Sequence, residues 1–290
     1  MDAASVKPLV SGFYDKPTGA VQYVVADPLM RRCAIIDPVL DFDEKSGATA
    51  TTNADALLDF IAREGLDVEW ILDTHPHADH FSAAHYLKQK TGAPTAIGER
   101  VVDVQKLWKA IYNWPDLPSD GRQWDRLFGE GEVFSIGRLP VKVLFSPGHT
   151  LASITYVVGD TAFVHDTLFM PDSGTARCDF PGGSAARLWG SLQGILALPD
   201  HTRVFVGHDY QTGGREPRWE STVGEQKASN IHLVAARTEA EFVALREARD
   251  RTLPMPRLIL HALQVNINGG RLPEPEANGR RYLKFPLDAL

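Results

Sequence analysis

The chain of 290 residues is poor in cysteine, in long apolar segments and in positive charge. Its only two cysteines, Cys33 and Cys178, lie far apart, so no disulfide framework is implied and a reducing compartment is expected. No apolar segment approaches the length of a membrane span. The formal charge of −7 argues against a broad nucleic-acid-binding surface. Residues 1–5 lack the basic and apolar pattern of a secretory signal, so we expect a cytoplasmic protein that engages neither nucleic acid nor membrane.

The remaining composition is that of a globular protein, and its apolar pattern predicts alternating strands and helices. Hydrophobic residues make up 43% of the chain and charged residues 23%. In the segment 53–64, Leu57, Leu58 and Ile61 share one helical face, and Gly65 follows where a C-terminal cap belongs. Further helices are expected at 82–90, at 101–110, after Ser184, and after the capping boxes Thr222/Glu225 and Thr238/Glu241. Strands are expected at 21–25, 33–36, 68–72, 141–145, 154–158, 161–164 and 203–206.

The order of these elements predicts an α/β protein with two similar halves. Each half runs from strands to helix, strand and helix, and sheets covered by outer helices form a four-layer αββα sandwich more readily than a barrel. We expect one domain over residues 1–290. The segment 98–130 is rich in structure-breaking residues and is interpreted as a lid-like insertion. The segment 254–290 is interpreted as a C-terminal extension.

A cluster of metal-ligand side chains directly follows the apolar segment 68–72. Three histidines and one aspartate fall within six residues there: His75, His77, Asp79 and His80. A buried strand that ends in such a cluster delivers several nitrogen and oxygen ligands to one point. The cluster therefore predicts a metal site.

Three further strands end in a side chain of the same kind. His149 follows 141–145, Asp166 follows 161–164 and His208 follows 203–206. Loops at strand ends commonly hold functional residues on a rigid scaffold. A lone histidine is more often structural than ligating, but together with the first cluster these three residues favour a shared metal centre.

This set of motifs resembles the metallo-β-lactamase superfamily over about residues 20–210. The resemblance implies the αββα sandwich, with the metal at the edge between two sheets. One version of this site holds two zinc ions: His75, His77 and His149 take one, Asp79, His80 and His208 take the other, and Asp166 bridges them. A bridging hydroxide would then hydrolyse an ester, thioester or amide, as in glyoxalase II, and this dinuclear Zn(II) hydrolase of the thioesterase or lactonase type is the alternative function.

Other segments resemble the persulfide dioxygenases, the sulfur dioxygenase family of sulfide oxidation. The segments that carry this resemblance are 174–180, 208–210, 221–225 and 253–256, together with Asn266. With them the resemblance extends over nearly the whole chain. That family uses one Fe(II) per chain, so the resemblance implies His75, His149 and Asp166 as ligands, while His77, Asp79, His80 and His208 would serve as hydrogen-bond partners around them.

The same resemblance implies a substrate and a reaction. Glutathione persulfide, or a related low-molecular-weight persulfide, would be oxidised by O₂ to sulfite and thiol. Arg177 matches the position that pairs with a substrate carboxylate, because a guanidinium binds a carboxylate through two parallel hydrogen bonds. Tyr210 is a second candidate for substrate binding. The resemblance suggests a homodimer and leaves room for a rhodanese-type sulfur-transfer partner, although the sequence carries no interface signal.

The chain departs from the persulfide dioxygenase pattern around the expected substrate pocket. Leu151 and Ala152 stand where proline and glycine are usual, and His165 stands where glycine commonly precedes the aspartate. These departures concern the identity of the thiol more than the metal. A catalytically inactive binding protein is a third reading, and the retention of every ligand argues against it.

Overall fold

Two six-stranded sheets pack face to face in the computed structural model, which describes residues 7–289. Residues 1–5, on which the absence of a secretory signal was judged, lie outside the described residues. The first sheet contains, in spatial order, β1 (Leu9–Tyr14), β2 (Val21–Asp27), β3 (Arg32–Ile36), β6 (Asp67–Leu72), β8 (Thr95–Gly98) and β9 (Arg126–Phe128). The second contains β10 (Val133–Ile136), β11 (Leu139–Phe145), β12 (Ile154–Val158), β13 (Thr161–His165), β14 (Arg203–Val206) and β15 (Glu220–Thr222).

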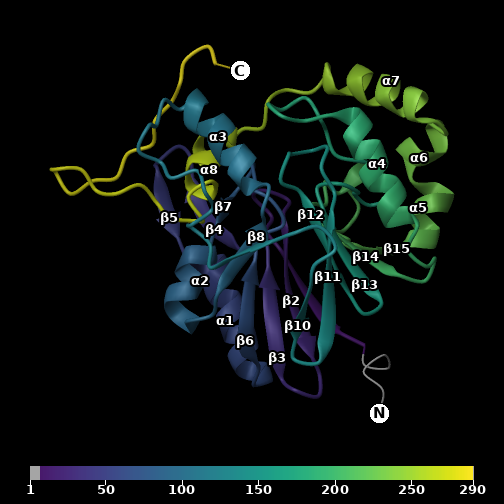
Figure 1. The fold of residues 1–290 in the computed structure, drawn as a ribbon, viewed down its shortest axis with the longest axis horizontal. Coiled ribbons are helices and arrows are strands. Elements are labelled where there is room, and N and C mark those ends of the chain that lie inside the picture. Colours follow the sequence, from purple (N-terminus) through teal and green to yellow (C-terminus); the bar gives the residue numbers. More distant parts are fainter. Residues whose placement is uncertain (1–6, 290) are drawn as a thin grey trace.

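Helices cover the outer face of each sheet, which completes the four layers (Figure 1). On the first sheet lie α1 (Thr52–Glu64) and α2 (Ala84–Thr91), and on the second lie α4 (Ala185–Leu196), α5 (Val223–Ser229), α6 (Ile231–Ala235) and α7 (Glu239–Asp250). A small third sheet contains β5 (Ala48–Ala50), β4 (Val39–Asp43) and β7 (Phe81–Ser82). The predicted α/β sandwich is therefore confirmed.

The interior has one apolar cluster between the sheets and one beneath each helical layer. Between the sheets, Tyr23 of β2 makes edge-on contacts with Phe163 of β13 and Phe205 of β14. Under α1, Leu57 and Ile61 are buried, as their spacing predicts. Burial of such side chains stabilises the fold by about 1.5–3 kcal/mol each, so the layers hold the strand ends at the site rigidly.

The local signals at helix ends are confirmed. Gly65 ends α1 in the left-handed conformation at φ +61°, and Ser184 accepts a hydrogen bond from the backbone of Arg187 at the start of α4. Both capping boxes form, Thr222 with Glu225 and Thr238 with Glu241.

Parts of the segments 98–130 and 254–289 pack against the core. The first contains α3 (Val101–Ile111), which packs with Trp124 against α8 (Ile259–Asn266) in a shared apolar cluster. No residue of 98–130 lines the cavity beside the metal ligands, whereas residues 253–258 do. Figure 1 shows this later stretch passing from α7 on one flank to α8 on the other. Within residues 7–289, no helix is both long enough and apolar enough to cross a membrane.

Candidate metal centre

The predicted metal ligands meet at one edge of the sandwich, where four strands end. Strands β3 and β6 run parallel, as do β13 and β14, so their carboxyl ends share an edge. The loop after β11 reaches the same place because Gly148 precedes His149. A Cβ on Gly148 would lie 2.4 Å from the backbone nitrogen of Leu188 in α4, and φ is +144° there. Glycine is thus required for this loop to pass against α4.

His75, His149 and Asp166 come together as a set of three donors. Each offers one ligand atom, and these atoms all lie within 4.8 Å of one another. All three side chains are buried, and Nε2 of His75 has no hydrogen-bond partner within residues 7–289. An unpartnered buried nitrogen is costly unless something binds it. Two imidazoles and one carboxylate therefore fit a divalent transition-metal ion.

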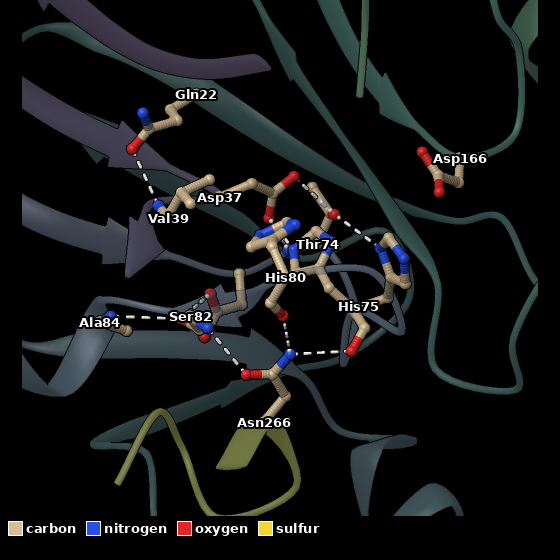
Figure 2. Close-up of polar contacts among 12 residues, drawn as sticks. Gln22, Asp37, Val39, Thr74, His75, His80, Ser82, Ala84, Asp166 and Asn266 are labelled. Carbon is tan, nitrogen blue, oxygen red and sulfur yellow. Dashed lines mark hydrogen bonds and ion pairs between the residues drawn. The ribbon is translucent and has the colours of Figure 1, made fainter. Parts of the chain in front are cut away.

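Thr74 and Asp37 fix the ring of His75 (Figure 2). The Thr74 hydroxyl donates to Oδ2 of Asp37 at 2.8 Å, so it is available to accept from Nδ1 of His75 at 3.0 Å. The Thr74 backbone also donates to Oδ1 of Asp37 at 2.7 Å. With its proton on Nδ1, the ring presents the lone pair of Nε2, which is the form that binds a metal.

His149 and Asp166 are held by equally short contacts. Nδ1 of His149 donates to the backbone carbonyl of Arg177 at 2.8 Å, which leaves Nε2 on the side of Asp166, 3.7 Å from its Oδ2. The other oxygen of Asp166, Oδ1, accepts from Nδ1 of His208 at 2.6 Å. His149 and Asp166 are therefore oriented by residues that are distant in the sequence, whereas His75 is oriented by the adjacent Thr74.

His208 connects the two acidic residues of the site. Its Nε2 donates to Oδ2 of Asp79 at 2.6 Å, and the same oxygen accepts from Nδ1 of His80 at 2.9 Å. Burial alone would lower the pKa of His208, but Asp166 and Asp79 outweigh it and raise that pKa well above its ordinary value. The ring is therefore an imidazolium between two carboxylates.

The histidines differ in charge because their neighbours differ. Burial, followed by the neighbouring His77, lowers the pKa of His75 well below its ordinary value, so His75 is neutral. Burial would also lower the pKa of His77, but Asp37 outweighs it and raises that pKa to about 9. The contact responsible joins Nε2 of His77 to Oδ1 of Asp37 at 3.0 Å.

A second group of donors lies beside the first. His77, Asp79 and His80 also offer ligand atoms within 4.8 Å of one another, as do Asp79, Asp166 and His208. Nδ1 of His77 and Nε2 of His80 are buried and have no hydrogen-bond partner among the described residues. These side chains therefore offer enough ligand atoms for one metal ion or for two.

A cavity of about 790 Å³ opens beside His149 and Asp166. Phe169 and Phe180 form apolar parts of its wall, and residues 253–258 close one side. Both predicted substrate residues reach it. Tyr210 stacks on His208, with ring centroids 5.8 Å apart, and remains 58% exposed.

Arg177 also lines the cavity, but its guanidinium is already bound. It forms two hydrogen bonds with Asp179, at 2.7 and 2.6 Å, and one with the carbonyl of Pro254 at 2.6 Å. Its side chain also lies over the ring of Phe180. Arg177 thus joins the site to the segment 253–258, and its contact with substrate stays a prediction.

Several residues that organise the site carried no strong signal in the sequence. Asp37, the residue after the strand expected at 33–36, was not singled out in the sequence, yet it supports both Thr74 and His77. Asn266 was noted only as part of a family pattern; its side chain donates to the carbonyls of His77 and His80 and accepts from the backbone of Ser82 (Figure 2).

His165, which stands where a glycine commonly precedes the aspartate, was not among the predicted ligands. It is buried at φ +41°, and its Nε2 lies 2.9 Å from the hydroxyls of Ser146 and Thr167. Its ring centroid is 5.0 Å from that of His75. The residue thus packs directly against a predicted ligand.

Comparison with known proteins shows a family and several relatives that this chain resembles. The family model described as "Metallo-beta-lactamase superfamily" matches residues 16–208. The chain is 73% identical, over 98% of its length, to a "Beta-lactamase hydrolase-like protein" from Xylella fastidiosa, and it spans 65% of that protein. It is 46% identical, over 99% of both chains, to "Glyoxylase B2" from Dictyostelium discoideum.

Two further relatives carry another name. The chain is 27% identical to "Persulfide dioxygenase ETHE1, mitochondrial" from Mus musculus, over 92% of this chain and 91% of that protein. The crystal structure of ETHE1 from Myxococcus xanthus superimposes with a TM-score of 0.73 at 28% identity, covering 91% of this chain and all of that one.

Proposed function

Because the chain belongs to the metallo-beta-lactamase superfamily, we propose that its metal centre makes it an iron persulfide dioxygenase. The proposed reaction consumes a low-molecular-weight persulfide, O₂ and water and releases a thiol, hydrogen sulfite and a proton: RSSH + O₂ + H₂O → RSH + HSO₃⁻ + H⁺. One observation carries the proposal. His75, His149 and Asp166 converge as three donors, whereas both nitrogens of His208 contact carboxylates, so an ion bound to His208 would displace one of these contacts.

The three donors are of the kind that suits Fe(II). Two neutral imidazoles and one carboxylate form the ligand set of non-haem iron oxygenases, which leaves other positions open. His75, His149 and Asp166 would hold a ferrous ion, which would supply redox chemistry for the reaction of dioxygen with the persulfide sulfur.

The chain's own residues orient the donors and shape the cavity. Thr74 and the Arg177 carbonyl hold the protons of His75 and His149 on Nδ1, so both Nε2 atoms keep their lone pairs. His208 holds Oδ1 of Asp166 and leaves Oδ2 free. Phe169 and Phe180 present apolar surface beside the donors, which keeps bulk water from a reactive persulfide.

The similarity to two ETHE1 proteins and the lining of the cavity support the proposal. The mouse and Myxococcus xanthus proteins named ETHE1 resemble this chain over more than nine-tenths of its length. Arg177 and Tyr210 line the cavity where a persulfide would lie. A homodimer and a rhodanese-type sulfur-transfer partner remain predictions.

A dinuclear zinc hydrolase is the second candidate, and a specific observation favours it. Nδ1 of His77 and Nε2 of His80 are buried without a hydrogen-bond partner among the described residues, so the site offers donors beyond the set of three. The similarity to the Dictyostelium discoideum protein named Glyoxylase B2 supports the same reading. Two zinc ions with a bridging hydroxide would hydrolyse a thioester.

Metal analysis and two assays separate the candidates. The protein is purified anaerobically, and O₂ uptake and sulfite release with glutathione persulfide are measured beside hydrolysis of S-lactoylglutathione. We expect one iron per chain, one O₂ consumed per persulfide and no thioester cleavage. Two zinc ions per chain with thioester cleavage and no O₂ uptake would overturn the proposal in favour of the hydrolase.

Asp166→Ala tests the ligand assignment in the same preparation. This variant should lose iron and O₂ uptake together, because a carboxylate donor is removed. His201→Ala is the matched control, since His201 is exposed and lies on the turn before β14. Retention of stoichiometric iron by Asp166→Ala would remove Asp166 from the ligand set.

A further inference from the structure

The wall of the cavity is rich in arginine, but most of that charge is already compensated. The arginines that line it are Arg177, Arg246, Arg249 and Arg257. A substrate with a carboxylate gains most from a cation that has no ion-pair partner in the free protein, because it displaces no existing contact. The arginine that has no ion-pair partner in the free protein should therefore decide which substrates the cavity binds.

Two of these arginines are bound within the wall itself. Arg177 is held by both oxygens of Asp179, as described above. Arg246 is almost fully buried, and its guanidinium contacts Asp250 at 2.8 Å and the carbonyl of Thr175 at 2.9 Å. Releasing Arg246 would leave the buried carboxyl group of Asp250 without its partner, and releasing Arg177 would break both of its hydrogen bonds with Asp179.

Two further charged residues of the wall, Arg257 and Asp172, also have ion-pair partners. Arg257 lies 3.4 Å from Glu44, and the acidic Asp172 is bound by Arg215 through two hydrogen bonds of 2.6 and 2.9 Å. His232, another wall residue, is neutral near pH 7. Burial, followed by the charges of Arg246 and Arg249, lowers its pKa to about 4.

Arg249 is the exception. It lies on the last turn of α7 with its side chain exposed, and within residues 7–289 its guanidinium makes neither an ion pair nor a hydrogen bond. Outside the metal ligands, the cavity wall therefore carries one uncompensated positive charge.

We propose that Arg249 binds a carboxylate of the substrate and so selects persulfides of acidic thiols. This inference rests on the proposed function, because it names the substrate class of the same cavity. Arg177 then acts by holding the segment 253–258 against the site through Pro254, and Arg249 supplies the cation that the sequence assigned to Arg177. A neutral persulfide gains nothing from this charge.

Kinetics of charge variants with two substrates test the assignment. Arg249→Ala, Arg249→Lys and Arg249→Glu are compared with the wild type, using glutathione persulfide and the neutral persulfide of 2-mercaptoethanol. Arg251→Ala is the matched control, because Arg251 is exposed, lies two residues away and does not line the cavity. Iron content is measured for every variant.

The expected pattern is specific to charge. Arg249→Ala should raise KM for glutathione persulfide about tenfold, since a partly exposed charge-assisted contact is near the lower end of hydrogen bonds to charged groups. Its kcat, its iron content and its KM for the neutral persulfide should not change. Lysine should restore most of the affinity, glutamate should weaken it further, and Arg251→Ala should match the wild type.

A binding measurement keeps this inference separate from the proposed reaction. Glutathione itself is titrated calorimetrically into the wild type and Arg249→Ala, and we expect the same tenfold loss of affinity whether or not the protein consumes O₂. Equal KM changes for both persulfides, or unchanged glutathione binding in Arg249→Ala, would overturn the role of Arg249. Absence of O₂ uptake with intact glutathione binding would instead count against the dioxygenase.

Discussion

Replacing His208 tests how the acidic residues of the metal centre are held. Its imidazolium lies between Oδ1 of Asp166 and Oδ2 of Asp79, at 2.6 Å from each, and is 2% exposed. In His208→Ala the buried carboxylate of Asp166 and the partly exposed carboxylate of Asp79 face one another with no cation between them. We expect the metal-free variant to lose stability and the metal-bound variant to lose less, because a divalent ion beside Asp166 supplies positive charge.

The size of the loss follows from the two hydrogen bonds. Each hydrogen bond to a charged group contributes about 1.5–3 kcal/mol, and removing one partner of a buried ion pair costs about 3–5 kcal/mol. Two such bonds give about 3–6 kcal/mol, so we expect the free energy of unfolding of the metal-free protein to fall by about 4 kcal/mol, which lies within both ranges. The total free energy of unfolding of such a domain is about 5–15 kcal/mol, so a loss of this size is large.

Urea unfolding with chelator and with anaerobic Fe(II) measures this difference. His208→Ala should still bind one iron per chain, with affinity reduced about 10- to 100-fold, as is typical when a residue that orients a ligand is removed. His208→Gln retains a donor and should lose less stability. If the wild type binds two ions and His208→Ala binds one, His208 is a ligand itself and the reasoning is refuted.

The remaining predictions concern three other residues. Thr74→Val should weaken Fe(II) binding about 10- to 100-fold in a chelator competition, because His75 loses the acceptor for its Nδ1 proton. Asn266→Ala should lower the free energy of unfolding in urea by about 3 kcal/mol, because it leaves three buried backbone groups without partners, whereas Asn268→Ala should have little effect. His232 has a folded pKa of about 4 against about 6.5 unfolded, so the unfolded chain binds the extra proton. Stability should therefore fall by up to about 3 kcal/mol as the pH drops from 6.5 to 4, and His232→Gln should remove that part of the pH dependence; equal slopes in wild type and variant would contradict it.

Local sequence signals predicted the regular elements because those signals act over a few residues. The spacing of Leu57 and Ile61 indicates the buried face of α1, and Gly65 indicates its end, without any knowledge of the partner sheet. Eight strands were not predicted: β1, β4, β5, β7, β8, β9, β10 and β15. All of them except β1 and β4 have four residues or fewer, too few to show clear alternation.

The positions of the loops that carry the metal ligands could be predicted for a similar reason. The residues that hold those ligands in place could not be predicted. His75 and His149 directly follow apolar strands, so their position at the sheet edge could be read from the sequence. Asn266 contacts residues 77–82 from more than 180 positions away, and the carbonyl of Arg177 meets His149 across 28 residues. Such contacts depend on how α8 and the 174–180 segment pack, which no periodic pattern encodes.

The number of metal ions that the site binds depends on the hydrogen bonds among its ligand side chains. A list of the ligand residues does not show these bonds. Binding at His75, His149 and Asp166 uses an Nε2 atom that already lacks a partner and a carboxylate oxygen that His208 leaves free. Binding a second ion with His208 as a ligand would first break its contact with Asp79 at 2.6 Å and remove its proton. That proton is held by two carboxylates, so the second ion must compete with it while the first does not. The two sites are therefore unequal even though all seven donors are present, and the one that requires no deprotonation of His208 should fill first.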